Sequence, residues 1–289
     1  MSAGCPPTAS TGTISWIGSA DGQGTWGEPA GLGLPLDDRG LLLADGLFET
    51  VLVEQGEPRL LEQHLERWGD SAALLGLASP PDQTVVQELA RAAVQRSGIG
   101  TGALRLNWSR GGGGRGLELP AAGASAGRFW LQLSACEPVF EAVAVIVSPS
   151  ERRCHTSVLS RCKTFAYGSS IQARRQARSA GADDALLRST AGGLCCSTAA
   201  NLLMLHEGRW LTPALSCGCL PGVMRRRALE LGVAMESEEP IELDQWQQGA
   251  ITGACLLNSL GCRPLLRCEE VTLDAMTRKQ AEALWRALL

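Results

Sequence analysis

The lysine at position 163 is the residue whose type and setting best suit covalent chemistry. Of the 26 basic residues, 24 are arginine, and the two lysines are Lys163 and Lys279. Lys279 lies in the amphipathic segment AMTRKQAEALWRALL and is expected on the solvated face of a helix. Lys163, in LSRCKTFAYG, follows an apolar run and precedes a helical pattern, a setting typical of a nucleophilic or Schiff-base amine. A compositional bias towards arginine could also leave either lysine by chance.

Three further features could bind an anionic group. Gly222, in LPGVMRRR, opens a helical pattern, where unpaired N–H groups and the helix dipole attract anions; the alternative is an ordinary helix start. Arg67 could supply a guanidinium or lie in solvent. GGGGRG at 111–116 could close on an anion or form a hairpin tip, but it matches neither a Walker loop nor a dinucleotide fingerprint. A lysine for an aldehyde, with Arg67 and Gly222 for a phosphate, describes pyridoxal phosphate.

The adjacent cysteines in GGLCCSTAAN (192–201) could be a redox pair, half of a metal site, or two small buried side chains. The chain has 11 cysteines and three scattered histidines, and neither Cys195–Cys196 nor Cys217–Cys219 has the spacing of a zinc site. We expect no metal, and free thiols in a reducing cytoplasm. The N-terminus MSAGCPPTASTGT, which has neither a basic nor an apolar region, does not resemble a signal peptide.

Composition and charge exclude several classes of protein. The net charge of −4 does not suit a surface for nucleic acid or anionic lipid, and no apolar run approaches the roughly 20 residues that span a bilayer. With 45% hydrophobic residues the 289-residue chain can bury a sizeable core, in one large domain or two. We expect no nucleic-acid or membrane partner, and the partner that we expect is a small-molecule substrate.

The periodicity of the chain predicts a mixed α/β (α+β) protein of two domains. We expect a disordered lead-in at 1–12, an N-terminal α+β domain at 13–150 and a C-terminal α/β domain at 151–289. GGLCC is expected to form a turn, and a short strand should lead to Lys163. The expected strands are 13–18, 47–54, 58–61, 103–110, 128–136, 141–149, 184–188, 201–205, 251–258 and 263–268, and the expected helices are 61–77, 82–98, 168–180, one within 216–232, and one from about 272.

Eight segments between residues 36 and 267 carry a family pattern. They are DRGLLLADGLFET (38–50), HLERWGDSAALLGL (64–77), SRGGGGRG (109–116), CKTFAYGSSIQARRQA (162–177), GADDALL (181–187), STAANLLML (197–205), LTPALSCGCLPGVMRRRALEL (211–231) and LLNSLGCRPL (256–265). On these segments the chain resembles the class IV, or fold-type-IV, pyridoxal-phosphate enzymes, which include branched-chain and D-amino acid aminotransferases and 4-amino-4-deoxychorismate lyase. The resemblance implies a two-domain, D-amino acid aminotransferase-like fold and a homodimer, with pyridoxal 5'-phosphate at the domain interface.

The resemblance also implies roles for individual residues. Lys163 matches the Schiff-base lysine, and Tyr167 falls near a residue that contacts the cofactor ring oxygen. Arg67 matches the arginine that binds the cofactor phosphate. The other implied phosphate contacts lie after Gly222 and on a second loop, at Val223, Met224, Asn258 and Ser259.

The chain departs from the family at Cys196, five residues before Asn201. Family members usually carry a glutamate there, which pairs with the protonated pyridine nitrogen and keeps the ring a strong electron sink. A thiol is a weak hydrogen-bonding group and is mostly uncharged at neutral pH. A register shifted by one residue would place Cys195 or Ser197 there, and neither is acidic. The chain could therefore be an enzyme that tolerates a weaker electron sink, or a degenerate, non-catalytic homologue.

Several details favour the lyase branch of the family. Three segments resemble the versions found in the lyases: SRGGGGRG, CCSTAAN, and GVM where aminotransferases often have GIT. Some aminotransferases share the first of these segments. The resemblance thus implies a lyase that releases pyruvate from aminodeoxychorismate to give 4-aminobenzoate for folate biosynthesis, with a branched-chain or D-amino acid aminotransferase as the alternative. Arg110 and Arg115 could bind substrate carboxylates, or lie exposed in the loop. Glu49 could line the pocket, although an inward strand residue is more often structural.

Overall fold

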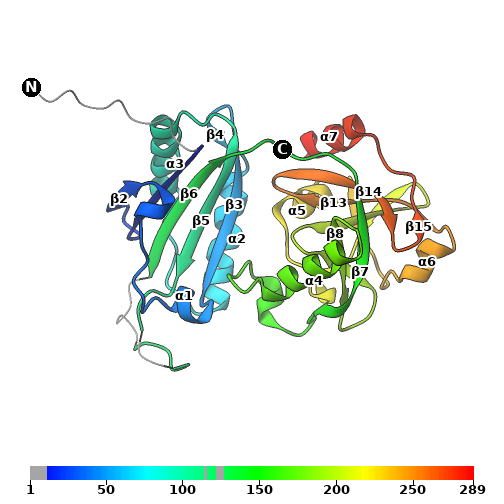
Figure 1. Cartoon of the computed structure of the whole chain (residues 1–289), viewed down its shortest axis with the longest axis horizontal. Helices are drawn as coiled ribbons and strands as arrows, with labels where there is room; N and C mark the ends of the chain where they lie inside the picture. The colour runs from blue at the N-terminus through cyan, green and yellow to red at the C-terminus, as the bar shows by residue number, and fades with distance from the viewer. Residues whose placement is uncertain (1–11, 114–115, 122–126) are drawn as a thin grey trace, which may run out of the picture. The chain divides into compact units, whose positions relative to one another are not determined.

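The computed structural model describes residues 12–113, 116–121 and 127–289, which form two compact units (Figure 1). The first unit extends to Glu137 and the second begins at Pro138. The division falls earlier than the boundary expected near residue 150, because the strand at Val143–Arg153 pairs with strands of the second unit. Residues 1–11 of the expected lead-in lie outside the described residues.

The first unit is built on a six-stranded antiparallel sheet with the order β2-β1-β6-β5-β3-β4. Short turns join β1 to β2 and β3 to β4, whereas the neighbours β1–β6 and β3–β5 are not consecutive in the chain. The turn at Gln55–Gly56 has a left-handed backbone, with φ of 56° and 81°. The strands are β1 (Thr13–Gly18), β2 (Gly24–Gly27), β3 (Gly46–Glu54), β4 (Glu57–Pro58), β5 (Gly102–Ser109) and β6 (Arg128–Ala135), and the helices are η1 (Pro29–Gly31), α1 (Arg39–Leu43), α2 (Leu61–Leu74) and α3 (Gln83–Ser97).

The core of the first unit lies between one face of this sheet and α2. Alternate residues of a strand point to the same face, so Leu47, Glu49 and Val51 of β3 share the face that α2 covers. Trp68 of α2 packs against Phe129 of β6, with ring centroids 5.8 Å apart. Glu49 is therefore a carboxylate on an otherwise apolar face, and such a group must find polar partners inside the unit.

The second unit contains a mixed, nine-stranded sheet whose pairings form a closed ring. The ring runs β10-β13-β14-β7-β8-β9 and returns to β10 through the pair Cys196–Asn201. The pairs β14–β7, β7–β8 and β11–β12 are parallel, and the remaining pairs of this sheet are antiparallel. The strands are β7 (Val143–Arg153), β8 (Asp184–Ser189), β9 (Leu194–Ser197), β10 (Asn201–His206), β11 (Arg209–Thr212), β12 (Ala234–Glu236), β13 (Ile251–Asn258), β14 (Gly261–Cys268) and β15 (Val271–Thr272).

Two apolar clusters fill the second unit. One includes Val145, Leu186, Leu202 and Leu256, from four strands of the ring. The other joins Ala173 and Ala177 of α4 to the cysteines of β9 and to Cys217 and Cys219, which lie between β11 and α5. The helices are η2 (Val158–Arg161), α4 (Gly168–Ser179), η3 (Leu215–Cys217), α5 (Val223–Glu230), α6 (Leu243–Gln247) and α7 (Arg278–Arg286).

Three local predictions differ from the structure. GGLCC is not a turn: Gly192 and Gly193, with φ of 103° and 71°, make the turn, and Cys195 and Cys196 lie in strand β9. The short 3-10 helix η2, not a strand, leads to Lys163. The last helix begins at Arg278 rather than near 272, because Thr277 and Gln280 form a capping box at its start. None of the helices in the described ranges has the length and apolar character needed to cross a membrane.

Candidate functional site

Lys163 and Tyr167 lie together between η2 and α4. The Lys163 ammonium donates a hydrogen bond of 3.2 Å to the Tyr167 hydroxyl, and both side chains are partly buried. Tyr167 is the N-cap residue of α4 and the single tyrosine of the sequence. The Tyr167 hydroxyl therefore directs the Lys163 amine, which lies in the chain between the end of η2 and the start of α4.

The start of α5 has the geometry expected of an anion-binding helix N-terminus. Gly222 is the N-cap, with extended φ and ψ of −65° and 140°, and Val223 and Met224 form the first turn. The N–H groups of a first turn have no partner within their own helix. A Cβ atom on residue 222 would overlap the side-chain oxygen of Asn201, so glycine is required here. Asn201 also donates from Nδ2 to the Leu220 carbonyl, at 2.9 Å.

Cys196 pairs in the sheet with Asn201, whose side-chain oxygen lies against Gly222. It is 7% exposed and belongs to an apolar cluster that includes Cys195 and Cys219. Asp184, an acid close to this segment in sequence, accepts hydrogen bonds from Thr198 at 2.6 Å and from Arg174 at 2.8 Å. Its carboxylate is thus already paired, and it does not replace the glutamate that Cys196 lacks.

Asn258 and Ser259 lie at the hairpin between β13 and β14. Asn258 donates from Nδ2 to the carbonyl of Ala199, at 3.3 Å, and its own carbonyl accepts a hydrogen bond from the indole of Trp285, at 2.9 Å. The second expected phosphate loop is therefore anchored to the turn between β9 and β10, which follows Cys196.

Arg67 belongs to a buried charged cluster in the first unit. Its Nε donates to Glu49 Oε1 at 2.9 Å and its Nη2 donates to Oε2, while Nδ1 of His64 lies 2.7 Å from Oε2. Glu49 and His64 are each 1% exposed and Arg67 is 9% exposed. A carboxylate only accepts hydrogen bonds, so His64 carries a hydrogen on Nδ1.

The charge of Arg67 determines the ionisation of Glu49. Burial by itself would raise the pKa of the Glu49 carboxyl, but the charge of Arg67 and the hydrogen bond from His64 lower this pKa to about 2. The sequence did not identify His64 as part of a site. Its position three residues before Arg67, on the same face of α2, was the available signal.

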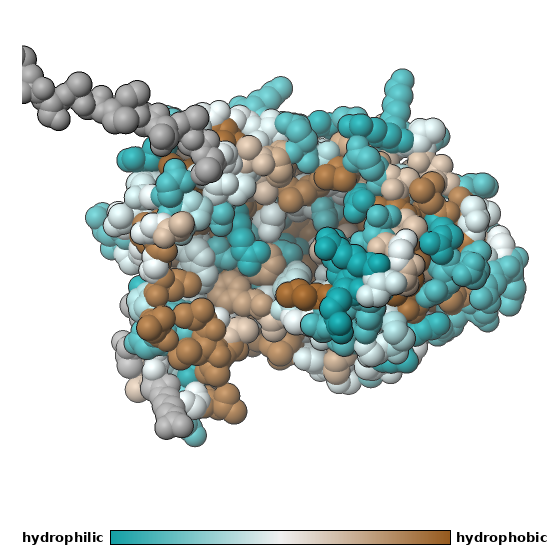
Figure 2. Space-filling model, in the orientation of Figure 1, coloured by the Kyte–Doolittle hydropathy of each residue, from teal (hydrophilic) through white to brown (hydrophobic). Residues whose placement is uncertain are grey.

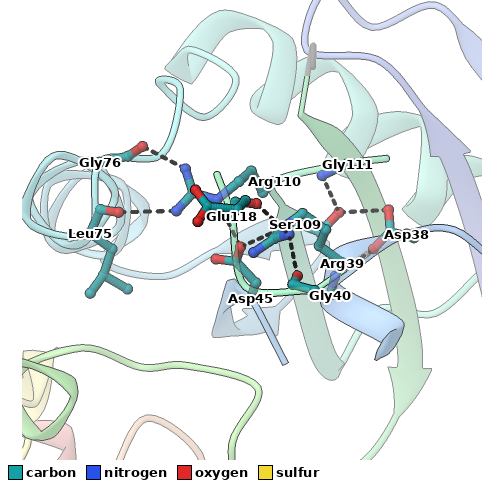
Figure 3. Close-up of polar contacts among 11 residues, drawn as sticks. Asp38, Arg39, Gly40, Asp45, Leu75, Gly76, Ser109, Arg110, Gly111 and Glu118 are labelled. Atoms are coloured by element: carbon teal, nitrogen blue, oxygen red, sulfur yellow. Dashed lines mark hydrogen bonds and ion pairs between the residues drawn. The ribbon is translucent and has the colours of Figure 1, made fainter. Parts of the chain in front are cut away.

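Arg110 is held by the first unit itself (Figure 3). Its Nε donates to Asp45 at 2.8 Å, Nη1 to the Gly76 carbonyl at 2.7 Å and Nη2 to the Leu75 carbonyl at 3.1 Å. Asp45 is shared with Arg39, at 2.9 Å. Through these contacts Arg110 links the end of β5 to the end of α2. A role for Arg110 in substrate binding remains a prediction. Arg115 lies outside the described residues.

The chain is similar to known proteins over most of its length. Residues 46–268 match the family described as amino-transferase class IV. A Schizosaccharomyces pombe protein, provisionally named an aminodeoxychorismate lyase, is 30% identical over 196 residues, or 67% of this chain and 77% of that protein. A Methanocaldococcus jannaschii protein, provisionally named a branched-chain-amino-acid aminotransferase, is 27% identical over 207 residues, or 71% and 70%.

The fold is confirmed by a solved structure. The fold IV-transaminase from Curtobacterium pusillum superposes with a TM-score of 0.78 at 24% identity, covering 94% of this chain and 99% of that one. The two units thus have the mixed α/β architecture that the sequence pattern predicted.

The buried Glu49 predicts how stability responds to acid. Because the folded pKa of about 2 lies below the ordinary 4.5, the stabilising contribution of this carboxylate is present above about pH 4.5 and is lost as pH falls towards 2. Glu49→Gln should lower the unfolding free energy at pH 7 by about 3–5 kcal/mol, since it leaves Arg67 buried without its counter-ion. The substitution should also weaken the dependence of the unfolding free energy on pH between about pH 4.5 and pH 2.

Urea unfolding followed by tryptophan fluorescence at several pH values measures both effects. Glu57→Gln, a change at an exposed glutamate of the same unit, is the control and should behave as wild type. Wild-type stability of Glu49→Gln at pH 7 would contradict the account.

Proposed function

Because the chain belongs to the amino-transferase class IV family, we propose that it is a pyridoxal-phosphate-dependent 4-amino-4-deoxychorismate lyase. The proposed reaction releases pyruvate from aminodeoxychorismate and leaves 4-aminobenzoate, a step of folate biosynthesis. The observation that carries the proposal is the buried thiol of Cys196, on β9, at the position where the family's acid is expected. The similarity to the S. pombe protein supports the same reaction.

The residues of the second unit suit this cofactor. Lys163 would hold the aldehyde carbon, beside the hydroxyl of Tyr167. The N–H groups at Val223 and Met224 would bind the phosphate, and glycine at 222 lets the Asn201 side chain lie against this helix start. Asn258, Ser259 and Arg67 remain proposed phosphate contacts. The bound cofactor would supply an electron sink for the substrate carbon that carries nitrogen.

Lys163 has two proton transfers to perform in the proposed reaction. Its Nζ would take the proton from the ring carbon of the substrate that bears the amino group. The carbon–oxygen bond to the enolpyruvyl group then breaks, and the ring becomes aromatic. The same proton, returned by Nζ to the methylene carbon of the leaving group, gives pyruvate, so that no other reactant is needed. The Tyr167 hydroxyl keeps the amine directed during both transfers.

The thiol of Cys196 favours this reaction over transamination. A thiol is a weaker hydrogen-bonding partner than a carboxylate for a protonated ring nitrogen, so the electron sink would be weaker with Cys196 than with glutamate. Transamination must stabilise a full carbanion on the amino acid and therefore depends more strongly on the electron sink. Elimination of pyruvate is driven by aromatisation and tolerates a weaker sink.

A class IV aminotransferase is the second candidate. The observation in its favour is the 27% identity to the M. jannaschii protein, over a similar share of the chain. The Lys163–Tyr167 pair would serve that reaction equally well. A non-catalytic homologue, the third possibility, would keep the fold and lose both activities.

We further propose that the protein acts as a homodimer. Six leucines on α1 and on two nearby segments expose between 42% and 83% of their surface, and Figure 2 shows brown residues gathered over α1. An apolar surface of this kind marks a protein–protein contact, and a second copy of the chain is the occupant that the family resemblance implies. The six residues are Leu36, Leu41, Leu42, Leu43, Leu117 and Leu119.

The lyase proposal predicts one product and one essential amine. Purified protein with pyridoxal phosphate and aminodeoxychorismate should release 4-aminobenzoate, and Lys163→Ala should lower the rate by at least 10³-fold because it removes the proton carrier. Lys279→Ala, which changes the other lysine, is the matched control and should keep wild-type activity. Folded, cofactor-loaded protein that forms no product from aminodeoxychorismate would refute the lyase function.

The thiol argument predicts a change in reaction preference. Cys196→Glu restores the acid and should raise aminotransferase activity on branched-chain amino acids or D-alanine at least tenfold, while Cys196→Ser should not. Coupled assays of keto-acid formation, with the absorption spectrum of the bound cofactor, measure the change. If Cys196→Glu alters neither the spectrum nor the balance of reactions, Cys196 does not face the ring nitrogen.

The dimer proposal predicts that charge on the leucine patch separates the subunits. Leu41→Glu combined with Leu42→Glu should give a monomer in sedimentation velocity, because burying two carboxylates in an apolar interface is costly. Leu266→Glu, at an exposed leucine of β14, is the control and should leave the dimer intact. A wild-type monomer, or a double variant that still dimerises, would argue against this interface.

A further inference from the structure

Side chains from several elements donate hydrogen bonds to the carbonyl groups of the loop that leads into α5. Asn201 Nδ2 donates to the Leu220 carbonyl at 2.9 Å, and Arg153 Nε donates to the Gly218 carbonyl at 3.0 Å. Cys195 Sγ donates to the Cys217 carbonyl, with the sulfur 3.4 Å from the oxygen. Arg225 Nη2 donates to the Pro213 carbonyl at 2.8 Å. Side chains from β7, β9, β10 and α5 therefore fix the loop (213–222) along its whole length.

Arg153 also binds the segment that carries Lys163. Its Nη2 donates to the carbonyl of Ser160 at 2.9 Å, and Ser160 Oγ donates back to the carbonyl of Cys154 at 2.7 Å. Ser160 lies in η2, three residues before Lys163. One guanidinium thus bridges the backbone that precedes the lysine and the backbone that precedes the α5 helix start.

At Gly218 the loop (213–222) also packs closely against the residues that follow Arg153. Gly218 has φ of 86°, and a Cβ atom added to it would lie 2.9 Å from the Cys154 carbonyl oxygen and 3.0 Å from the His155 Cα. The chain that follows Arg153 therefore lies directly on the loop (213–222). Arg153 therefore joins η2 to the loop (213–222), and the packing of Cys154 and His155 on Gly218 holds the same loop against the end of β7.

From this geometry we propose that Arg153 is a positioning residue, which sets the separation between the Lys163 amine and the phosphate-binding start of α5. The proposal rests on the proposed cofactor site. Pyridoxal phosphate carries its aldehyde and its phosphate arm on neighbouring ring carbons, so a rigid ligand must reach both groups at once. The protein binds it tightly only if the two subsites are held at the matching separation. Arginine suits this role because its planar fork can donate to two carbonyls in fixed directions.

Cys195 supports the same loop from β9. Its side chain is fully buried, and its sulfur also contacts the thiols of Cys196 and Cys219. Hydrogen bonds with these two thiols, together with burial, raise the pKa of Cys195, so it keeps the hydrogen that it donates to Cys217. The two adjacent cysteines thus differ in their surroundings: Cys195 holds the loop, and Cys196 occupies the position proposed to face the ring.

The coupling is tested by comparing a ligand that spans both subsites with ligands that occupy one. In Arg153→Gln, the affinity for pyridoxal phosphate should fall about 10- to 100-fold, the equivalent of one or two charge-assisted hydrogen bonds. The affinities for pyridoxal, which has no phosphate, and for inorganic phosphate should change less than threefold, because each subsite remains intact. Arg152→Gln, at the exposed neighbour on β7, is the control and should bind all three ligands as wild type does.

Equilibrium titration followed by absorbance and tryptophan fluorescence, with competition for inorganic phosphate, gives the three affinities. If Arg153→Gln does not fold, Arg153→Lys keeps the charge but loses the fork, and the same pattern is expected. Equal losses for all three ligands would show a merely local structural role and overturn the proposal, as would unchanged affinity for pyridoxal phosphate. Wild-type protein that does not bind pyridoxal phosphate would overturn the proposed function as well, and so the two failures are distinguishable.

Discussion

The pairing of β9 with β10 at Cys196 and Asn201 is the contact on which the arrangement of the second unit depends. It closes the ring of strands, and it places Asn201 where its amide can hold the Leu220 carbonyl and its oxygen lies against Gly222. The same pairing places Cys196 opposite the residue whose side chain contacts the start of α5. A shift of one residue in this register would turn Cys196 away and remove the support of the α5 helix start at the same time.

In the first unit, the buried carboxylate of Glu49 must be paired if it is to stay charged. Glu49 lies on a sheet face that is otherwise apolar, and an isolated carboxylate could not remain charged there. Arg67 and His64 make burial possible by pairing with both carboxylate oxygens. The arginine expected to bind phosphate is therefore also a structural partner, and two hydrogen bonds to the buried Glu49 hold its guanidinium in one orientation. Preorganisation of this kind reduces the entropy lost when an anion binds.

The sequence predicted the individual reactive groups better than their supports. Lys163 stood out because the chain otherwise uses arginine, and Gly222 stood out because it opens a helical pattern. The sequence pattern predicts a turn rather than a strand at Cys195–Cys196, since two glycines precede the cysteines and periodicity does not show their pairing with β8 and β10. The domain boundary was placed too late for the same reason, because the parallel partners of β7 follow much later in the chain. Contacts such as that of Arg153 with two backbone carbonyls have no signature in periodicity or composition.

The central claim is that Lys163 is the amine that holds the cofactor, and it can be tested directly. Reduction with borohydride in the presence of pyridoxal 5'-phosphate permanently joins the cofactor to the amine that carries it, and peptide mass mapping then identifies that residue. The account predicts a single modified site at Lys163, with Lys279 unmodified and serving as an internal control. Modification of Lys279 alone, or no modification of folded protein at saturating cofactor, would contradict it.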